Sequence, residues 1–328
     1  MSHEITRRQN GFHEMAYVGQ KPWHGLGQEL EQGAPIEKWL VSAGMDWKVQ
    51  RSKVRYATAR NAGVDTFAEW PEYNVLMRSD SKAPLGMVSD KYKIVQPREV
   101  LEFFRDLMEA AGYHLETAGT LYGGRKFWAL ASIGAEDRVI GNDLLKGRLL
   151  VATSCDGSMK TTVKNVAERV VCNNTLQIAM GEKGAASVAV PHNTTFNAQA
   201  VKKQLGVAVG SFHRFIADAR LLAARKVAPL EVEAFMAKVL KEAEVEAAKE
   251  QRAFQSILNL FQGGGHGSRL PGVAGTAWGL VNAVTEYVDH DRPNRNETNR
   301  LNSAWFGSGA DMKDRAMDAA RELVYVER

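Results

Sequence analysis

The stretch His-Leu-Glu-Thr-Ala-Gly-Thr-Leu-Tyr-Gly-Gly-Arg-Lys-Phe-Trp-Ala-Leu-Ala-Ser-Ile, residues 114–133, decides how this chain can fold. Two runs of strand-like composition, 114–122 and 126–133, lie on either side of Gly123-Gly124. Glycine reaches positive φ without a side-chain clash, so this pair favours a tight β-hairpin. The stretch therefore predicts two antiparallel strands joined by a short turn.

The segments around this hairpin predict an α+β fold. An apolar face at helical spacing begins at Pro97 and precedes the hairpin, and an apolar strand at 149–153 follows it. Asp156-Gly157 marks a turn, after which residues 161–166 can pair back on that strand. Residues 169–180 fit either a buried strand end or a helix. This order of elements differs from alternating βαβ units, so we expect an antiparallel sheet with helices on one face.

Composition patterns along the chain predict two regions. Residues 1–195 read as an α+β domain with basic strands. Residues 196–328 read as a mainly helical region, because apolar residues recur there at helical spacing. The glycine-rich stretch 263–267 interrupts this pattern and is interpreted as a connection between helices.

The overall composition narrows the class of protein without naming a function. The chain has 328 residues, of which 45% are hydrophobic and 24% charged, and these values are ordinary for a globular protein. Two cysteines cannot form a disulfide framework for this length, and no apolar run is long enough to span a membrane. We therefore expect a cytoplasmic protein with reduced cysteines and no membrane contact. A net charge of +4 is compatible with nucleic-acid binding but does not require it.

Motifs for metals, nucleotides and nucleophiles are weak or missing. The sequence has no Cys-x-x-Cys, His-x-x-x-His or His-Glu-x-x-His pattern, and the stretch 263–268 lacks the Gly-Lys-Ser/Thr of a P-loop. We therefore predict no metal and no cofactor. Ser154 and Cys155 lie in a turn without a sequence signal for a histidine partner, so a catalytic role there is the least favoured interpretation.

Basic residues near aromatic residues give the most informative signal. Residues 48–60 contain five Lys or Arg and no acidic residue, and alternation places three of these cations on one strand face. Single-stranded nucleic acid is usually held by cations at the phosphates and aromatic rings under the bases. Ordinary solvated sheet cations and a core tryptophan are the competing interpretation. The predicted DNA-binding residues are Arg51, Lys53, Arg55, Arg125, Lys126, Lys160, Lys164 and Arg169, with Trp128 or Tyr122 stacking on bases.

Motifs distributed over nearly the whole chain resemble the phage/plasmid-like protein family, a domain of unknown function found on bacteriophages, prophages and plasmids. These motifs are Pro22-Trp-His-Gly-Leu-Gly27, Arg78-Ser-Asp80, Leu85-Gly-Met-Val-Ser89, Tyr92-Lys-Ile-Val-Gln96, Gly119-Thr-Leu-Tyr-Gly-Gly-Arg125, Thr153-Ser-Cys-Asp-Gly-Ser158 and Arg169-Val-Val-Cys-Asn-Asn-Thr-Leu176. Cys155 stands where many relatives have histidine. The resemblance singles out loop residues Trp23, His24, Asp156, Asn173 and Asn174, and it implies a mobile element without assigning an activity.

These observations lead to three functional hypotheses. The first is a mobile-element protein of DNA metabolism that binds single-stranded DNA, acts as a homo-oligomer in recombination or annealing, and meets host or phage recombination proteins. The predicted sheet backed by a helix is similar in outline to phage single-strand annealing proteins, although fold does not fix function. The second is an interaction protein that inhibits a host nuclease or defence complex through its helical region. The third is a nucleic-acid-processing enzyme that uses His24, Asp156 and Asn174.

Overall fold

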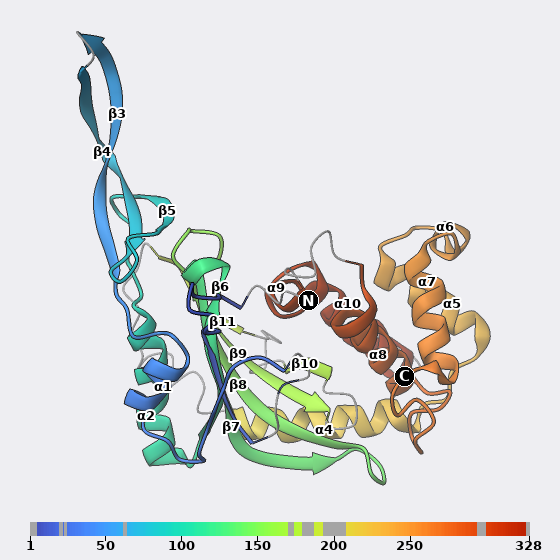
Figure 1. Ribbon diagram of the computed structural model, residues 1–328. Coiled ribbons are helices and arrows are strands. Elements are labelled where there is room, and N and C mark those ends of the chain that lie inside the picture. Colours follow the sequence, from blue (N-terminus) through green and yellow to red (C-terminus); the bar gives the residue numbers. More distant parts are fainter. Residues whose placement is uncertain are drawn as a thin grey trace.

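The computed structural model describes residues 5–19, 22, 25–61, 64–169, 174–178, 187–192, 208–293 and 300–325. It confirms the predicted α+β class, with a large and mostly antiparallel sheet and a helical C-terminal region (Figure 1). The predicted boundary near residue 195 falls outside the described residues and stays a prediction.

The large sheet is built around the predicted hairpin. Its strands follow the order β10-β9-β8-β7-β6-β1-β2, β11 also pairs with β9, and β1–β2 is the parallel pair. Tyr122–Gly124 forms the short turn η1 between β6 and β7, and Gly123 has the positive φ of 72° that such a turn requires. The strands are β1 (Met15–Val18), β2 (Gln28–Leu30), β6 (His114–Leu121), β7 (Lys126–Arg138), β8 (Leu144–Ser154), β9 (Thr161–Arg169), β10 (Asn174–Ile178) and β11 (Ser187–Val190).

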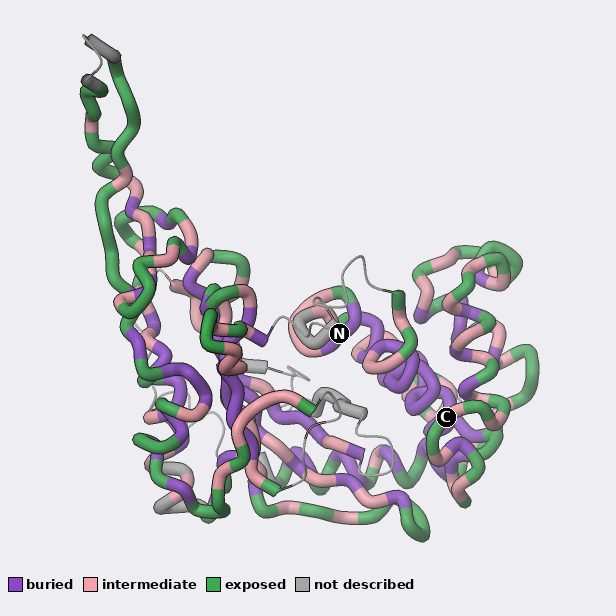
Figure 2. Tube along the Cα trace, in the orientation of Figure 1, coloured by how far each residue is buried: buried purple, intermediate pink, exposed green. Residues whose placement is uncertain are grey.

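A second sheet projects from the body of the protein (Figure 1). It consists of β3 (Val49–Asn61), β4 (Val64–Arg78) and β5 (Pro84–Ser89), in the order β3-β4-β5. Because β5 pairs only with residues 73–77 of β4, the remaining parts of β3 and β4 form a two-stranded ribbon. We call residues 54–61 and 64–72 the arm. The tube in Figure 2 shows that most of the arm is exposed to solvent.

Helices cover the face of the large sheet that carries its main core. Helix α1 (Ile36–Ser42) packs on α2 (Pro97–Ala111), and α2 packs on β6 and β7. Pro97 begins α2, as predicted, since a first-turn position needs no backbone donor. Helix α4 (Ala208–Ala224) lies across β7, β9 and β10. One apolar core joins these helices to the inward-facing residues of the sheet.

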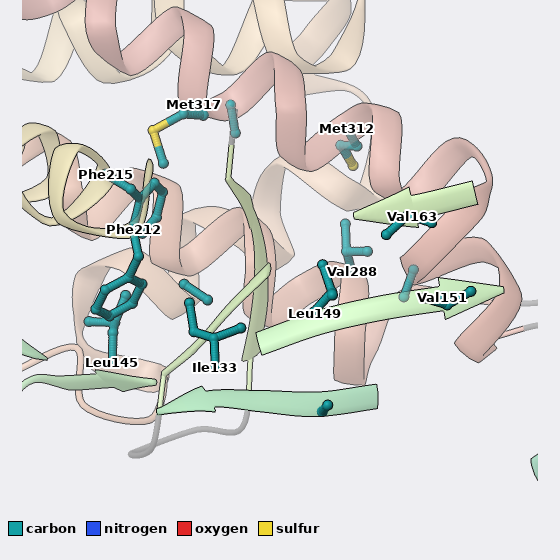
Figure 3. Close-up of a cluster of buried hydrophobic side chains, with 14 of the residues drawn as sticks. Ile133, Leu145, Leu149, Val151, Val163, Phe212, Phe215, Val288, Met312 and Met317 are labelled. Carbon is teal, nitrogen blue, oxygen red and sulfur yellow. The ribbon is translucent and has the colours of Figure 1, made fainter. Parts of the chain in front are cut away.

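The helical region packs around one long helix. Helix α10 contacts α4, α5, α8 and α9, and its Met312 and Met317 belong to the same apolar core as the strand residues Leu149 and Val163 (Figure 3). No helix in the described part of the chain is long and apolar enough to cross a bilayer. The helices and turns here are α5 (Pro229–Leu240), α6 (Val245–Lys249), α7 (Arg252–Asn259), η2 (Leu260–Gly264), α8 (Ala277–Glu286), η3 (Tyr287–Asp291), α9 (Arg300–Phe306) and α10 (Ser308–Tyr325).

A buried carboxylate anchors the base of the arm to the large sheet. Glu14 is fully buried and accepts two hydrogen bonds from Arg78, the last residue of β4, at 2.7 and 2.9 Å. Thr120 of β6 and Arg8 also donate to it, at 2.5 and 2.6 Å. The guanidinium of Arg78 lies 4.2 Å above the Trp47 ring. These bonds satisfy both oxygens of Glu14 and tie three segments together at one point.

Candidate nucleic-acid interface

Two of the three predicted cations of β3 turn towards the loop that follows β5. Arg51 Nη2 donates to the carbonyl oxygen of Tyr92 at 2.6 Å, and Lys53 Nζ lies 3.7 Å from a carboxylate oxygen of Asp90. Arg55 instead pairs with Glu69 across the ribbon at 2.8 Å in an exposed ion pair. Alternation does place the three cations on one strand face, but only Arg51 and Lys53 join the other basic segments.

The same loop also contacts the turn between β8 and β9. Tyr92 Oη donates to the Ser154 carbonyl at 2.7 Å, and its ring stacks on His192 with centroids 4.4 Å apart. The two ring nitrogens of His192 lie 3.0 Å from the Lys93 carbonyl and 3.1 Å from the Met159 carbonyl. The loop and the turn are therefore joined directly, which brings Lys91 and Lys93 to the same end of the molecule as Lys160.

The hairpin turn of the large sheet completes this arrangement. The backbone N–H of Cys155 donates to the Arg125 carbonyl at 2.7 Å, so Arg125 lies beside the β8–β9 turn. Lys126 Nζ lies 5.6 Å from the Tyr122 ring centroid, and burial lowers the pKa of this ammonium while nearby Asp156 raises it. We call the set brought together here the basic junction: Arg51, Lys53, Lys91, Lys93, Arg125, Lys126 and Lys160.

Close backbone packing holds the β8–β9 turn against β5. A Cβ atom on Gly86 of β5 would lie 2.7 Å from the Cα of Asp156, so only glycine fits there. The Asp156 carboxylate accepts a hydrogen bond from the Ser158 N–H at 2.9 Å, which is the usual role of aspartate in a turn. Both observations give structural reasons for residues in the quoted motifs.

Three residues predicted to bind DNA lie elsewhere and stabilise the interior. Arg169 is 0% exposed, and its Nε lies 2.5 Å from Asp143 Oδ1. Trp128 is 2% exposed and packs edge-on against Trp305 in a second apolar cluster, so its ring is not available to a base. Lys164 is largely buried, and its Nζ donates to the Trp305 carbonyl at 3.0 Å. Spacing along the sequence could not show that these side chains face inward.

Other predicted residues remain untested. Trp23, His24 and Asn173 lie outside the described residues, and Asn174 begins β10, where its side chain is not described. Cys155 is buried, and burial raises the pKa of its thiol, so this side chain lacks the accessible thiolate of a nucleophile. Within the described ranges, no three His, Cys, Asp or Glu side chains lie close enough together to hold a metal ion.

Asp90 is the carboxylate closest to Arg51 and Lys53. A hydrogen bond from Asn74 and the charge of Lys53 lower its pKa, so the group is ionised at neutral pH. It offsets part of the charge of Arg51 and Lys53. Lys91, Lys93, Arg125 and Lys160 are exposed and have no ion pair with any described residue. The uncompensated positive charge of the junction therefore comes mainly from the loop and the two turns.

Sequence reasoning missed Lys91 and Lys93 as members of this site. They alternate around Tyr92 just before α2, and alternation in so short a loop does not distinguish a binding surface from an ordinary solvated segment.

Comparison with protein families shows that most of this region belongs to a known domain. A model described as a domain of unknown function, DUF932, matches residues 84–305.

The chain belongs to the DUF932 family. The matched residues of the DUF932 domain include β5, the 90–93 loop, the η1 turn and the β8–β9 turn, whereas the arm precedes them. The predicted membership of a family of unknown function is thus confirmed, and the association with phages and plasmids stays a prediction. No curated protein and no solved structure matches the chain.

Proposed function

We propose that this protein binds single-stranded DNA at the basic junction and serves the DNA metabolism of a mobile element without a cofactor. The observation that supports this proposal is the meeting of β3, the 90–93 loop, residues 125–126 after η1 and the β8–β9 turn, each of which contributes cations. These segments are far apart in the sequence. Cations on one strand would be ordinary surface charge, but cations on four segments that contact one another can bind successive phosphates of one strand.

The balance of charge at the junction favours a polyanion over a single small anion. The cations are distributed over four segments and do not surround one buried pocket, and four of them are exposed without a carboxylate partner in the described structure. Each DNA phosphate that an exposed lysine or arginine neutralises releases counterions from the DNA, and this release favours binding. Such a surface supports binding with little dependence on base sequence, as an annealing protein requires.

Binding of labelled oligonucleotides, measured by fluorescence anisotropy, tests this proposal. Single- and double-stranded probes are compared at two salt concentrations, and mass photometry on the same samples reports whether the protein is a homo-oligomer. We expect the triple variant Lys91→Ala, Lys93→Ala and Lys160→Ala to bind single strands much more weakly than the unmodified protein. The matched control removes three exposed cations from other surfaces, namely Lys38→Ala, Arg252→Ala and Arg269→Ala, and should bind normally. Equal affinity of the two triple variants would contradict the proposal.

A second candidate function is favoured by the exposed apolar residues of the helical region. Leu230 is 78% exposed at the start of α5, and Leu221 of α4 is also exposed. Tyr325 of α10 is half exposed, and its Oη donates to Asp218 Oδ1 at 3.2 Å. Asp218 lies on α4, three residues before Leu221. Under this proposal a host protein binds here, and a purified complex with that protein would resist competition by single-stranded DNA. Loss of the complex in Leu230→Asp with normal DNA binding would support it.

A further inference from the structure

The glycine-rich loop between η2 and α8 carries an exposed histidine that is bonded to a buried carboxylate. The backbone N–H of His266 donates to both oxygens of Glu286, at 2.8 and 3.0 Å, and the ring Nδ1 lies 2.8 Å from Oε1 of the same group. The Glu286 side chain is 5% exposed, whereas that of His266 is 77% exposed. The two residues therefore connect a carboxylate at the end of α8, inside the protein, to an imidazole at its surface.

The main chain around His266 is fixed by further contacts. Arg169, which is fully buried, donates to the carbonyl oxygens of His266 and Gly267, at 3.3 and 3.4 Å. A Cβ atom on Gly265 would lie 2.9 Å from the carbonyl oxygen of Leu260, so glycine is needed for the loop to pack this closely on the end of the preceding helix. The imidazole thus projects from a segment that is held on both sides.

The contact with Glu286 determines which ring nitrogen of His266 carries the proton. An ionised carboxylate only accepts hydrogen bonds, so Nδ1 is the protonated nitrogen of the neutral ring. The lone pair is then on Nε2, which has no hydrogen-bond partner among the described residues. A carboxylate at one ring nitrogen also raises the basicity of the other, as it does in histidines that bind metals. Nε2 is therefore an exposed nucleophile in its reactive tautomer.

The surroundings of Nε2 favour covalent modification over a role in catalysis. A general base acts on a substrate that is enclosed in a cleft, whereas most of the His266 side chain faces solvent. An exposed imidazole can instead reach the reactive group of another molecule. Arg269 lies on the same loop, is exposed, and has no ion pair with any residue that the structure describes. A guanidinium suits the oxygens of an incoming phosphoryl group.

We propose that His266 accepts a phosphoryl group on Nε2 from an activated donor of the phosphoramidate or acyl phosphate class. The Nε2 lone pair attacks phosphorus and forms an N–P bond. The bond from phosphorus to the leaving group breaks, and ammonia or a carboxylate departs with the electron pair of that bond. The imidazole ring gains positive charge in this step, and the Glu286 carboxylate beside Nδ1–H stabilises it.

This site is separate from the basic junction. Arg169, which bonds the loop, pairs with Asp143 immediately before β8 begins, whereas the junction lies beside Ser154, where β8 ends. Substitutions in the loop should therefore leave the affinity for single-stranded DNA unchanged. Failure of the phosphoryl-acceptor proposal and failure of the proposed function can thus be told apart.

Treatment of the full chain with phosphoramidate tests the proposal. Peptide mass spectrometry at neutral pH follows the phosphorylation of each histidine with time. His114 and His213 are internal references, because both are exposed and have no carboxylate partner among the described residues. We expect His266 to react about 10- to 100-fold faster than either reference, which is the usual size of the effect of such a carboxylate. Phosphorus NMR should place the group on Nε2, and His266→Gln should remove this product.

The substitution Glu286→Gln tests the positioning role of the carboxylate. The glutamine oxygen can accept from the His266 N–H in the place of Oε2, while the amide nitrogen in the place of Oε1 donates to Nδ1. The loop is then kept, but the ring proton moves to Nε2. Nitrogen NMR should show this change of tautomer, and phosphorylation of His266 should slow about 10- to 100-fold. Circular dichroism establishes that the variant is folded.

The substitution Arg269→Ala separates recognition of the phosphoryl group from the reactivity of the imidazole. Diethyl pyrocarbonate is an uncharged reagent that acylates imidazole nitrogen, whereas phosphoramidate is an anion. We expect Arg269→Ala to react with diethyl pyrocarbonate at His266 as fast as the unmodified protein does. Its reaction with phosphoramidate should be slower, because the cation that binds the phosphoryl oxygens is gone.

Two results would overturn the proposal. In the first, His266 of the unmodified protein reacts with phosphoramidate no faster than His114 and His213, which would mean that its environment does not activate it. In the second, Glu286→Gln has its ring proton on Nε2 and is still phosphorylated at the unmodified rate. The carboxylate would then only hold the loop in place.

Discussion

Arg169 and Asp143 form an ion pair in the interior of the protein, with Nε and Oδ1 2.5 Å apart and both side chains almost fully buried. The second oxygen of Asp143 accepts a hydrogen bond from Trp278 Nε1 at 2.8 Å. Arg169 also donates to the backbone carbonyls of His266 and Gly267. This one pair therefore links the end of β9 to helix α8 and to the glycine-rich loop that precedes it.

Breaking this pair should destabilise the protein strongly. Removing one partner of a buried ion pair leaves the other charge without compensation, which typically costs about 3–5 kcal/mol. We expect Asp143→Ala and Arg169→Ala each to lower the free energy of unfolding by this amount in urea titrations. The exposed pair of Arg220 with Asp137 is the control, and Arg220→Ala should cost less than about 1 kcal/mol. Equal losses of stability at the two sites would show that burial does not determine how much each ion pair contributes.

Glu14 should also be important at the base of the arm. Glu14→Ala removes the buried one of the two carboxylates that bind Arg78, while Asp80 keeps the guanidinium paired, so we expect a loss of about 1–3 kcal/mol in the free energy of unfolding. Glu69→Ala breaks an exposed ion pair further along the arm and should cost less than about 1 kcal/mol. Chemical denaturation followed by circular dichroism measures both. A loss below about 1 kcal/mol in Glu14→Ala would argue against the anchoring role.

Asp314 should make stability depend on pH. Burial, which outweighs the opposing charge of Lys164, raises its pKa to about 6 with a smaller contribution from the charges of Asp318 and Asp311. Between about pH 4 and 6 the folded state keeps a proton that the unfolded chain has lost, so stability falls as the pH rises through this window. We expect Asp314→Asn to raise the free energy of unfolding by at most about 2–3 kcal/mol above pH 6 and to change it little near pH 4.

Thermal unfolding between pH 4 and pH 8 tests this expectation. Glu31→Gln is the control, because this carboxylate is exposed on another segment and is not among the charges that act on Asp314, so its substitution should have no comparable pH-dependent effect. If the stability of Asp314→Asn differs from that of the unmodified protein by the same amount at every pH in this range, the prediction is contradicted.

The salt dependence of DNA binding should report the number of phosphates held at the junction. For single strands, the slope of log affinity against log salt is about −0.7 for each phosphate neutralised. Removing Lys91, Lys93 and Lys160 together should therefore make the slope shallower by about 2. Anisotropy titrations over a range of salt concentrations measure this slope. A lower affinity with the original slope would mean that the lysines act through the fold and do not contact phosphates.

Local signals in the sequence predicted much of the central sheet. Gly123-Gly124 indicated the β6–β7 hairpin, Asp156-Gly157 indicated the turn before β9, and Pro97 indicated the start of α2; all three are confirmed. Each depends on backbone preferences within a few residues. The stretch 169–180, which fitted either a strand or a helix, contributes the strand β10.

The arm could be predicted only in part. The strand at 47–56 was expected, but the region around Phe67 and Trp70 was not, because a ribbon exposed on both faces has no buried side to give an alternating pattern. Arg169 was assigned to DNA because its partner Asp143 is 26 residues away and meets it only in the folded sheet. Lys91 and Lys93 join the site through backbone contacts that sequence spacing does not encode.

Because β3 lies at the edge of its sheet, its cations have a second role. The backbone of Val49 exchanges hydrogen bonds with the Gln96 side-chain amide, but no described strand pairs with the outer edge of β3. A row of backbone donors and acceptors along this edge therefore faces water. Such edges recruit strands from other molecules, and natural proteins discourage this by placing lysine or arginine along them. Arg51, Lys53 and Arg55 occupy that protective position. Neutralising them together would therefore favour aggregation, and the yield of such a variant would fall before its affinity for any ligand could be measured.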